Sequence, residues 1–405
     1  MESNVTQKKS IRKTFDWADF LLNNAIAIIL LLLLVVIIVI EPKFLSIVNF
    51  RNILAQASTR LIFALGVGGI IIAKGTDLSL GRQVGIAAVV SASLLQAVDY
   101  AYRMYPNLPK LPIIVPVLTV IAITALISAI NGFVISKLKV DPFVATLGMQ
   151  VIVFGLTSIY FDRPPYGAQP IGGLDKGFMS WAQGSLTVGP ASNPYIQIPY
   201  LIIYATIVTI IVWTLWNKTR FGKNMYAVGG NIEAATVSGV NVFKALMSTY
   251  VLAGILYGLG GALEAARVGS ATNRTGEGYE LDAIAACIVG GLSFNGGIGT
   301  VPGIVFGTLI FMVISYGLNF IGISPYLQYI VKGLIIIIAV AIDSRKYHTR
   351  YRLNKSACSQ NQSRTITSLP LAQPRGFFSR HRARMGDGLP EKAGTMRSAV
   401  PPLLP

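Results

Sequence analysis

Residues 21–40 of the 405-residue chain read LLNNAIAIILLLLLVVIIVI, a run without a charged side chain. At the α-helical rise of about 1.5 Å per residue, this run extends about 30 Å, the thickness of the hydrocarbon core of a bilayer. It follows a basic start (Lys8, Lys9, Arg12, Lys13), and no small-residue cleavage site comes after it. The run therefore predicts a retained first membrane helix rather than a signal peptide.

The composition extends this interpretation to the whole chain. Hydrophobic residues make up 53% and charged residues only 13%, against about 25% charged residues in soluble proteins. A surface with so few charges needs a solvent other than water, so we expect an all-α polytopic membrane protein with about ten transmembrane helices. The expected spans are Leu21–Ile40, Ile53–Ile72, Val84–Val98, Ile113–Ile135, Pro142–Phe161, Ile196–Trp216, Phe243–Ala266, Asp282–Leu292, Val301–Ile321 and Tyr326–Ile342.

The basic residues indicate topology rather than nucleic-acid binding. The net charge is +17, but twelve of the 34 Lys and Arg residues follow Asp343, and most others lie singly in short loops. Nucleic-acid binding would gather them on one face with aromatic residues. We expect a cytoplasmic segment 1–20, a transmembrane domain 21–343 and a disordered basic tail 344–405. Ten spans place both termini on one side, the cytoplasm, and the loop 162–195 outside.

Few polar side chains fall at membrane depth, and each is a functional hypothesis. The alternatives are snorkelling and interhelical pairing. Arg60, Glu264 and Lys332 lie within predicted spans, but no series of buried carboxylates marks a proton or sodium relay. The candidate pathway or gating residues are Asp77, Ser79, Asn131, Phe143, Glu280, Asp282 and Ser293.

Glycines interrupt the eighth span, Asp282–Leu292, and predict a half-helix or a re-entrant segment. The pairs Leu78-Ser79 and Leu292-Ser293 each precede a glycine-bearing span. These pairs are compatible with an inverted repeat and equally with chance.

The chain lacks the motifs of several enzyme classes. No GxxxxGK[ST] loop occurs, so any ATP that drives this protein would be hydrolysed by another subunit. The two histidines, His348 and His381, both lie in the tail, and the two cysteines, Cys287 and Cys358, suggest no disulfide framework. A membrane enzyme is therefore disfavoured.

The 217–243 loop carries the sharpest motif, Glu233-Ala234-Ala235 followed after three residues by Gly239. This EAA-x-x-x-G spacing is typical of the coupling loops of ABC permeases, and a short helix ending at Gly239 would suit a C-terminal cap. The residues that complete the type I motif are absent downstream. The candidate coupling residues are Gly230, Asn231, Glu233, Ala234, Ala235, Ser238 and Gly239.

From about Phe44 to Asp343 the chain resembles the ribose/xylose/galactose ABC permease family. The resemblance rests on five motifs in order: GTDLS at 75–79, PFVATLG at 142–148, the coupling loop, YELDAIAA at 279–286 and GGLSFNGG at 290–297. GRQVG at 81–85 and WNKTRFG at 216–222 are most similar to the galactose/methyl-galactoside branch.

The resemblance implies a ten-helix, type II importer-like fold in the bacterial inner membrane. It also implies a homodimer, a cytoplasmic ATPase that binds ATP and Mg, and a periplasmic sugar-binding protein. This chain would hold no cofactor, contact membrane lipid and bind no nucleic acid. A permease for ribose, xylose or a nucleoside and an ion-coupled secondary transporter are the alternatives. Family members end soon after the equivalent of Tyr347, whereas this chain continues.

Overall fold

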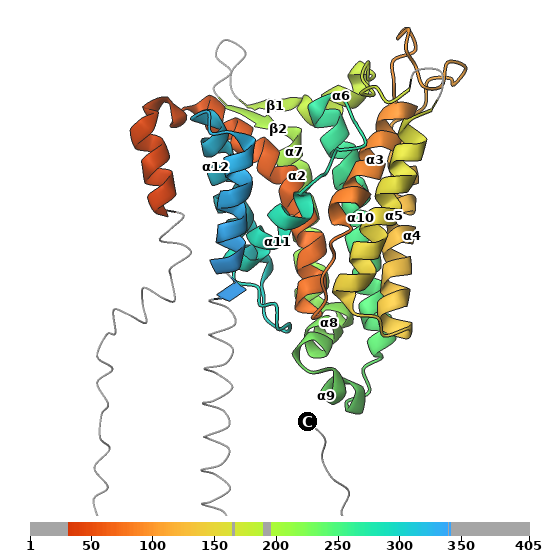
Figure 1. Ribbon diagram of the computed structural model, residues 1–405, viewed down its shortest axis with the longest axis vertical. Helices are drawn as coiled ribbons and strands as arrows, with labels where there is room; N and C mark the ends of the chain where they lie inside the picture. The colour runs from red at the N-terminus through yellow and green to blue at the C-terminus, as the bar shows by residue number, and fades with distance from the viewer. Residues whose placement is uncertain (1–30, 164–166, 189–195, 339, 342–405) are drawn as a thin grey trace, which may run out of the picture. The chain divides into compact units, whose positions relative to one another are not determined.

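Helices dominate the part of the chain that the computed structural model describes, residues 31–163, 167–188, 196–338 and 340–341 (Figure 1). These residues all fall within the first of two units, Met1–Arg350 and Tyr351–Pro405. The expected cytoplasmic segment 1–20 and basic tail 344–405 lie outside the described residues. The labelled elements are η1 (Pro42–Phe44), α2 (Ile47–Ile72), α3 (Leu80–Leu94), α4 (Ile114–Lys137), α5 (Pro142–Phe161), α6 (Lys176–Gln183), β1 (Ser185–Val188), β2 (Ile196–Pro199), α7 (Tyr200–Lys218), α8 (Arg220–Gly230), α9 (Ile232–Val237), α10 (Val242–Val268), α11 (Tyr279–Val289) and α12 (Val301–Phe320).

Six described helices are long and apolar enough to cross a membrane: α2, α4, α5, α7, α10 and α12. Four of them begin at a side-chain cap, which accepts a hydrogen bond from an otherwise unpaired N–H group; the caps are Ser46, Asp141, Asn241 and Thr300. Leu31–Ile40, α3 and Pro325–Ile338 are apolar but shorter. The structure therefore confirms a mostly helical membrane protein, and it does not confirm the count of ten spans.

The all-α expectation is wrong at one hairpin, in which β1 pairs antiparallel with β2. The span expected from Ile196 begins instead at Tyr200, because β2 occupies 196–199. The sequence IQIP alternates apolar and polar side chains, as a half-exposed strand does, and Pro199 precedes the first helical turn. By contrast, the third and eighth spans were expected to start too far along the chain, at Val84 and Asp282, whereas α3 begins at Leu80 and α11 at Tyr279.

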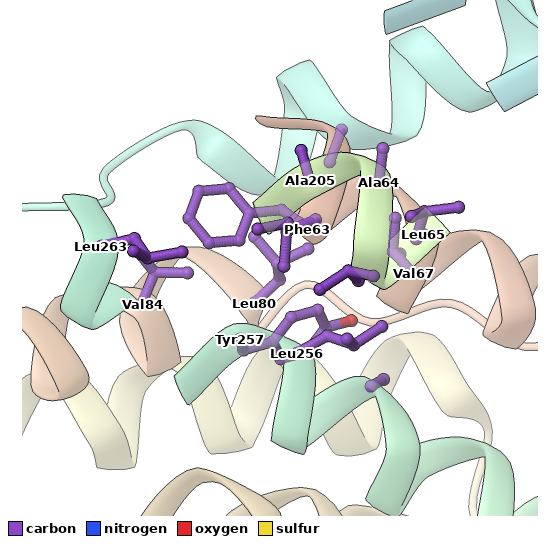
Figure 2. Close-up of a cluster of buried hydrophobic side chains, with 14 of the residues drawn as sticks. Phe63, Ala64, Leu65, Val67, Leu80, Val84, Ala205, Leu256, Tyr257 and Leu263 are labelled. Atoms are coloured by element: carbon purple, nitrogen blue, oxygen red, sulfur yellow. The ribbon is translucent and has the colours of Figure 1, made fainter. Parts of the chain in front are cut away.

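Helices α2 and α10 form the centre of the bundle, and α10 packs against α2, α3 and α4. Figure 2 shows side chains of α2 (Phe63, Val67), α3 (Leu80) and α10 (Tyr257, Leu263) filling the space between these helices. In the most apolar window of α2, 78% of the residues are buried, against 17% in α5. Helix α5 therefore presents most of its surface outward, whereas α2 is a core helix.

Two short helices each follow a long helix and a non-helical segment. Helix α2 leads through 73–79 into α3, and α10 leads through 269–278 into α11. The eleven residues of α11 extend only about 16 Å, roughly half of the hydrocarbon core. The structure thus supports the half-helix expected near Asp282. Leu78-Ser79 directly precedes α3, and Leu292-Ser293 lies in the loop that leads to the glycine-bearing α12, so the repeat stays a prediction.

The two ends of the bundle differ. Helix α6 and the β-hairpin lie at one end, which we call the hairpin end, and α8 and α9 lie at the other, the α9 end (Figure 1). At the hairpin end the Gln183 amide donates to the carbonyl oxygen of Ala266, at the end of α10. At the α9 end the N–H group of Gly297 donates to the carbonyl oxygen of Ile72, at the end of α2. The described part of the loop 162–195 and the loop 217–243 therefore lie at opposite ends, as expected.

Candidate functional site

Helix α9 carries the EAA-x-x-x-G motif and is defined at both ends by its sequence. At its start, the side-chain oxygen of Asn231 accepts a hydrogen bond from the N–H group of Ala234 (2.9 Å). At its end, Gly239 has a φ of +83°, and the N–H groups of Gly239 and Val240 donate to the carbonyl oxygens of Thr236 and Ala235. This is a Schellman cap, which requires a left-handed residue and favours glycine. The predicted short helix ending at Gly239 is confirmed.

The exposed surface of α9 carries the other motif residues. Gly230, Asn231, Glu233, Ala234 and Ser238 are exposed, and only Ala235 points inward, against Val228 and Ala245. Val237 is 91% exposed, the highest value among the large hydrophobic side chains described. The helix therefore presents an apolar tip beside a carboxylate, a surface suited to a groove on another protein.

Helix α8 is joined to the core through a glycine joint, which we define as Gly229, Gly296 and Gly297 with Ile72. A Cβ atom at position 229 would overlap the carbonyl oxygen of Ile72, and one at 296 would meet the carbonyl oxygen of Gly229. The Tyr226 hydroxyl donates to the carbonyl oxygen of Gly299 (2.8 Å). The joint thus connects α8 directly to the end of α2 and to the loop between α11 and α12.

Three of the candidate pathway residues meet in one buried network. The Asp77 carboxylate accepts hydrogen bonds from the N–H group (2.9 Å) and the hydroxyl (2.6 Å) of Ser79. The Ser79 oxygen in turn accepts from the amides of Asn131 (3.0 Å) and Gln83 (2.9 Å). Gln83 accepts from Ser128 (2.9 Å). These side chains are at most 1% exposed, so the network fixes the entry of α3 against α4.

Two buried oxygen atoms, the second carboxylate oxygen of Asp77 and the hydroxyl oxygen of Tyr257, make no hydrogen bond among the described residues. Sequence reasoning missed Gln83 and Ser128, although Gln83 follows Ser79 by four residues, the spacing at which helical side chains meet.

The other four candidates lie elsewhere. Phe143 is 53% exposed in the first turn of α5. Glu280 is buried against Gly81, and Asp282 pairs with Lys332 (2.8 Å). Ser293 is buried in the loop after α11. The structure does not bring the seven candidates into a single site.

A second buried network surrounds Glu264, which is 0% exposed. Its carboxylate accepts hydrogen bonds from Arg267 (2.8 and 3.0 Å), Tyr279 (2.9 Å) and Thr59 (2.9 Å). The Arg60 guanidinium lies over the Tyr279 ring, 3.1 Å from its centroid. Glu264 therefore joins α2, α10 and α11, which is the interhelical pairing considered above for the ionisable residues at membrane depth.

The long apolar helices, the half-helices and the buried polar networks define the chain as a multi-pass membrane permease. The sequence profile described as "Branched-chain amino acid transport system / permease component" matches residues 49–340. The chain belongs to this permease family.

Individual relatives share much of its length. The galactose/methyl galactoside import permease protein of Haemophilus influenzae is 54% identical over 329 residues, 81% of this chain and 96% of the relative. The corresponding Escherichia coli protein is 54% identical over 307 residues, 76% of this chain and 89% of the relative. The ribose import permease protein of Bacillus subtilis is 38% identical over 308 residues, 76% and 88% of the two chains. No solved structure matches this chain.

Proposed function

We propose that this chain is the membrane-spanning permease subunit of an ATP-driven importer for galactose or methyl galactoside in the bacterial inner membrane. The observation that carries the proposal is the 54% identity to a galactose/methyl galactoside import permease over 96% of that relative. The 38% identity to a ribose import permease makes ribose the second candidate. The short helices α3 and α11, which follow α2 and α10, fit a transporter whose pathway passes between discontinuous helices.

The proposed assembly has three kinds of protein. A second copy of this chain would complete the permease, a cytoplasmic ATPase would bind ATP and Mg, and a periplasmic binding protein would deliver the sugar. The three shorter apolar helices, together with α11, would complete ten spans of a type II importer-like fold surrounded by membrane lipid. Both termini would then be cytoplasmic, with the α9 end inside and the hairpin end outside.

Helix α9 would receive the motion of the ATPase. Its exposed tip, Ile232 and Val237 with Glu233, suits a groove, and the glycine joint would carry the displacement from α8 to α2 and to the α11–α12 loop. Because the joint consists of backbone atoms in contact, a shift of α8 acts on both segments without an intervening flexible side chain.

The test is co-reconstitution of the permease with its ATPase in liposomes. We expect ATP hydrolysis to rise when galactose-loaded binding protein is added, and we expect no hydrolysis by the permease alone. If galactose neither stimulates hydrolysis nor enters the liposomes and ribose does both, the proposed substrate is ribose rather than galactose. Failure of both sugars would reject the sugar importer.

The coupling role has its own variants. We expect Glu233→Lys and Gly239→Val to abolish stimulation, since the second forces a β-branched residue to a φ of +83°. Gly239→Asn is the matched control, because asparagine adopts the left-handed region at little cost. Normal stimulation in both disruptive variants would show that α9 does not couple to the ATPase.

A further inference from the structure

A group of polar side chains reaches the surface where the 272–277 segment, α3 and α5 meet. We call it the α5-side cluster. Arg82 and Arg274 lie on either side of Glu277, each with a nitrogen 3.8 Å from one of its carboxylate oxygens. The Asn273 amide donates to the Ser158 hydroxyl of α5 (3.3 Å). The cluster consists of Arg82, Ser158, Asn273, Arg274 and Glu277.

The backbone explains why these side chains face outward. A Cβ atom at Gly81 would overlap the carbonyl oxygen of Gly276, and the Cβ of a residue at 85 would lie 2.5 Å from that of Thr275. The segment therefore lies flat on α3, and Gly276 turns with a φ of +85°. The side chains on either side of this turn reach the surface, where Arg274 is 81% and Glu277 48% exposed.

The cluster lies at membrane depth. Arg82 precedes Leu94, the last residue of α3 at the hairpin end, by twelve residues, which corresponds to about 18 Å along the helix. Its guanidinium lies 4.4 Å from the centroid of the Phe154 ring, and Phe154 is seven residues from the end of α5, about 10 Å. Both positions fall well inside a hydrocarbon core of about 30 Å.

Charged side chains at this depth do not face lipid, because ionised groups in hydrocarbon are costly and line water-filled cavities or protein interiors instead. The adjoining face of α5 has the same mixed character. Phe143, Gln150, Phe154 and Ser158 lie on one stripe at helical spacing, whereas Ile152 lies on the opposite side and is 56% exposed. The same stripe contains Leu147, so this face of α5 mixes polar, aromatic and aliphatic side chains, whereas the opposite side at Ile152 is apolar.

The groups of the cluster are also incompletely paired. Both Arg–Glu separations of 3.8 Å exceed hydrogen-bond length, and the Arg82 Nη1 atom is buried without a hydrogen-bond partner among the described residues. Guanidinium, carboxylate and amide groups beside a partly exposed aromatic ring provide both hydrogen-bond donors and acceptors for hydroxyl groups, and an apolar surface for the C–H face of a pyranose ring.

We propose that the α5-side cluster is a transit site for the hexose, in which Arg82, Asn273 and Glu277 bind its hydroxyl groups as it passes along the surface where α3, α5 and the 272–277 segment meet. This inference rests on the proposed function, which names no sugar-contacting residue.

The first experiment measures transport by the complete complex with binding protein and ATPase in liposomes. We expect Arg82→Gln and Asn273→Ala to lower galactose uptake about tenfold, the effect of one lost hydrogen bond of about 1.4 kcal/mol. Asn273→Ala should also reduce the preference for galactose over at least one of the 2-, 3-, 4- and 6-deoxygalactoses, because the group that recognises that hydroxyl is gone. Copurification with the ATPase checks that each variant folds.

The second experiment tests the aqueous path directly. In a Cys358→Ser background, where the buried Cys287 remains, Arg274→Cys should react with a charged, membrane-impermeant thiosulfonate. Addition of galactose and binding protein should slow the reaction. Ile152→Cys, the matched control on the opposite face of α5, should not react.

The outcomes separate the two proposals. Galactose uptake that is normal in Asn273→Ala with unchanged preference, or an Arg274→Cys that is as unreactive as Ile152→Cys, overturns the transit site and leaves the importer standing. If the unchanged complex takes up no galactose, both the proposed function and the assignment of a hexose to this site are rejected. Slowed labelling by galactose with an altered preference in Asn273→Ala establishes the site.

Discussion

Glu264 shows how a single buried charge can hold three helices together. Its carboxylate has two ion-pair partners, Arg267 (2.8 Å) and Arg60 (3.9 Å), and hydrogen bonds from Tyr279 and Thr59. A carboxylate paired in this way replaces the water it loses on burial, and removing it leaves the arginines without their partner. The pairing is therefore structural, and the residue is distinct from the path proposed beside α5.

We expect Glu264→Gln to reduce the free energy of unfolding by roughly 3–5 kcal/mol, the usual cost of removing one partner of a buried ion pair. Thermal unfolding of the purified permease in detergent measures the change. Glu233→Gln is the control, because Glu233 is exposed on α9. A melting temperature of Glu264→Gln equal to that of the control would show that the network does not stabilise the bundle.

Asp175 has two structural roles at the hairpin end. One carboxylate oxygen accepts a hydrogen bond from Lys110 (2.8 Å), and the other caps α6 through the N–H group of Gly177 (2.8 Å). The hydrogen bond from Lys110 is the main cause that lowers the pKa of Asp175 below its ordinary value of 3.8. Because the folded pKa is the lower one, this contribution to stability is present above about pH 4 and is lost as the pH falls through the folded pKa.

Two substitutions separate these roles. Asp175→Asn keeps a capping oxygen and removes the charge, so we expect a loss of no more than about 1 kcal/mol at pH 7 that is smaller at pH 3, below the ordinary pKa of 3.8. Asp175→Ala also removes the cap and should cost about 1 kcal/mol more at both pH values. Thermal melts at pH 3 and pH 7 provide the comparison. Equal losses for the two variants would mean that the cap contributes nothing.

At the scale of elements, the glycine joint offers a test with adjacent residues. We expect Gly229→Ala to impair transport strongly or to prevent assembly, because its Cβ would overlap the carbonyl oxygen of Ile72. Gly230→Ala should fold and assemble normally, since nothing lies within 4 Å of a Cβ there. Uptake at matched membrane levels distinguishes them. Equal uptake by the two variants would show that the glycine joint does not transmit motion from α8 to α2.

The elements that sequence predicted best are those with a local signal. Helix α5 runs from Pro142 to Phe161, the predicted bounds, and both its cap Asp141 and its first residue Pro142 are local features. The short helix ending at Gly239 was predicted for a similar reason. Ile196–Pro199 was assigned to a span because its apolar residues adjoin those of α7, and only pairing with Ser185–Val188 makes it a strand.

The site was harder to predict, because its members are distant in sequence. Asp77 and Asn131 were both named, but only the packing of α3 on α4 shows that they share Ser79. Arg82 lies within the motif GRQVG, but the sequence did not indicate its pairing with Glu277, because Glu277 lies on the segment after α10. Glycines four residues apart, Gly81 and Gly85, were the available signal that a second backbone lies against α3.

At the scale of the whole molecule, the family match stops before the basic C-terminal segment. The profile matches residues 49–340. The segment from Ser344 onward holds 12 of the 34 basic residues and two acidic ones, an excess of 10, so without it the net charge of +17 becomes +7. We therefore attribute transport to the residues before Ser344, whereas the segment from Ser344 onward supplies most of the net positive charge.

We expect truncation after Tyr347 to leave sugar uptake unchanged. The alternative is that the basic strip Arg380-His381-Arg382-Ala383-Arg384 binds anionic lipid, at about 1 kcal/mol per basic residue near a charged surface. Uptake at matched expression, in liposomes with and without anionic lipid, separates the two cases. A matched variant with the three arginines of the strip changed to glutamine tests the charge alone. Wild-type uptake by both variants in both lipids supports a dispensable segment. A large loss confined to anionic liposomes and shared by the glutamine variant would assign the segment a role at the membrane surface.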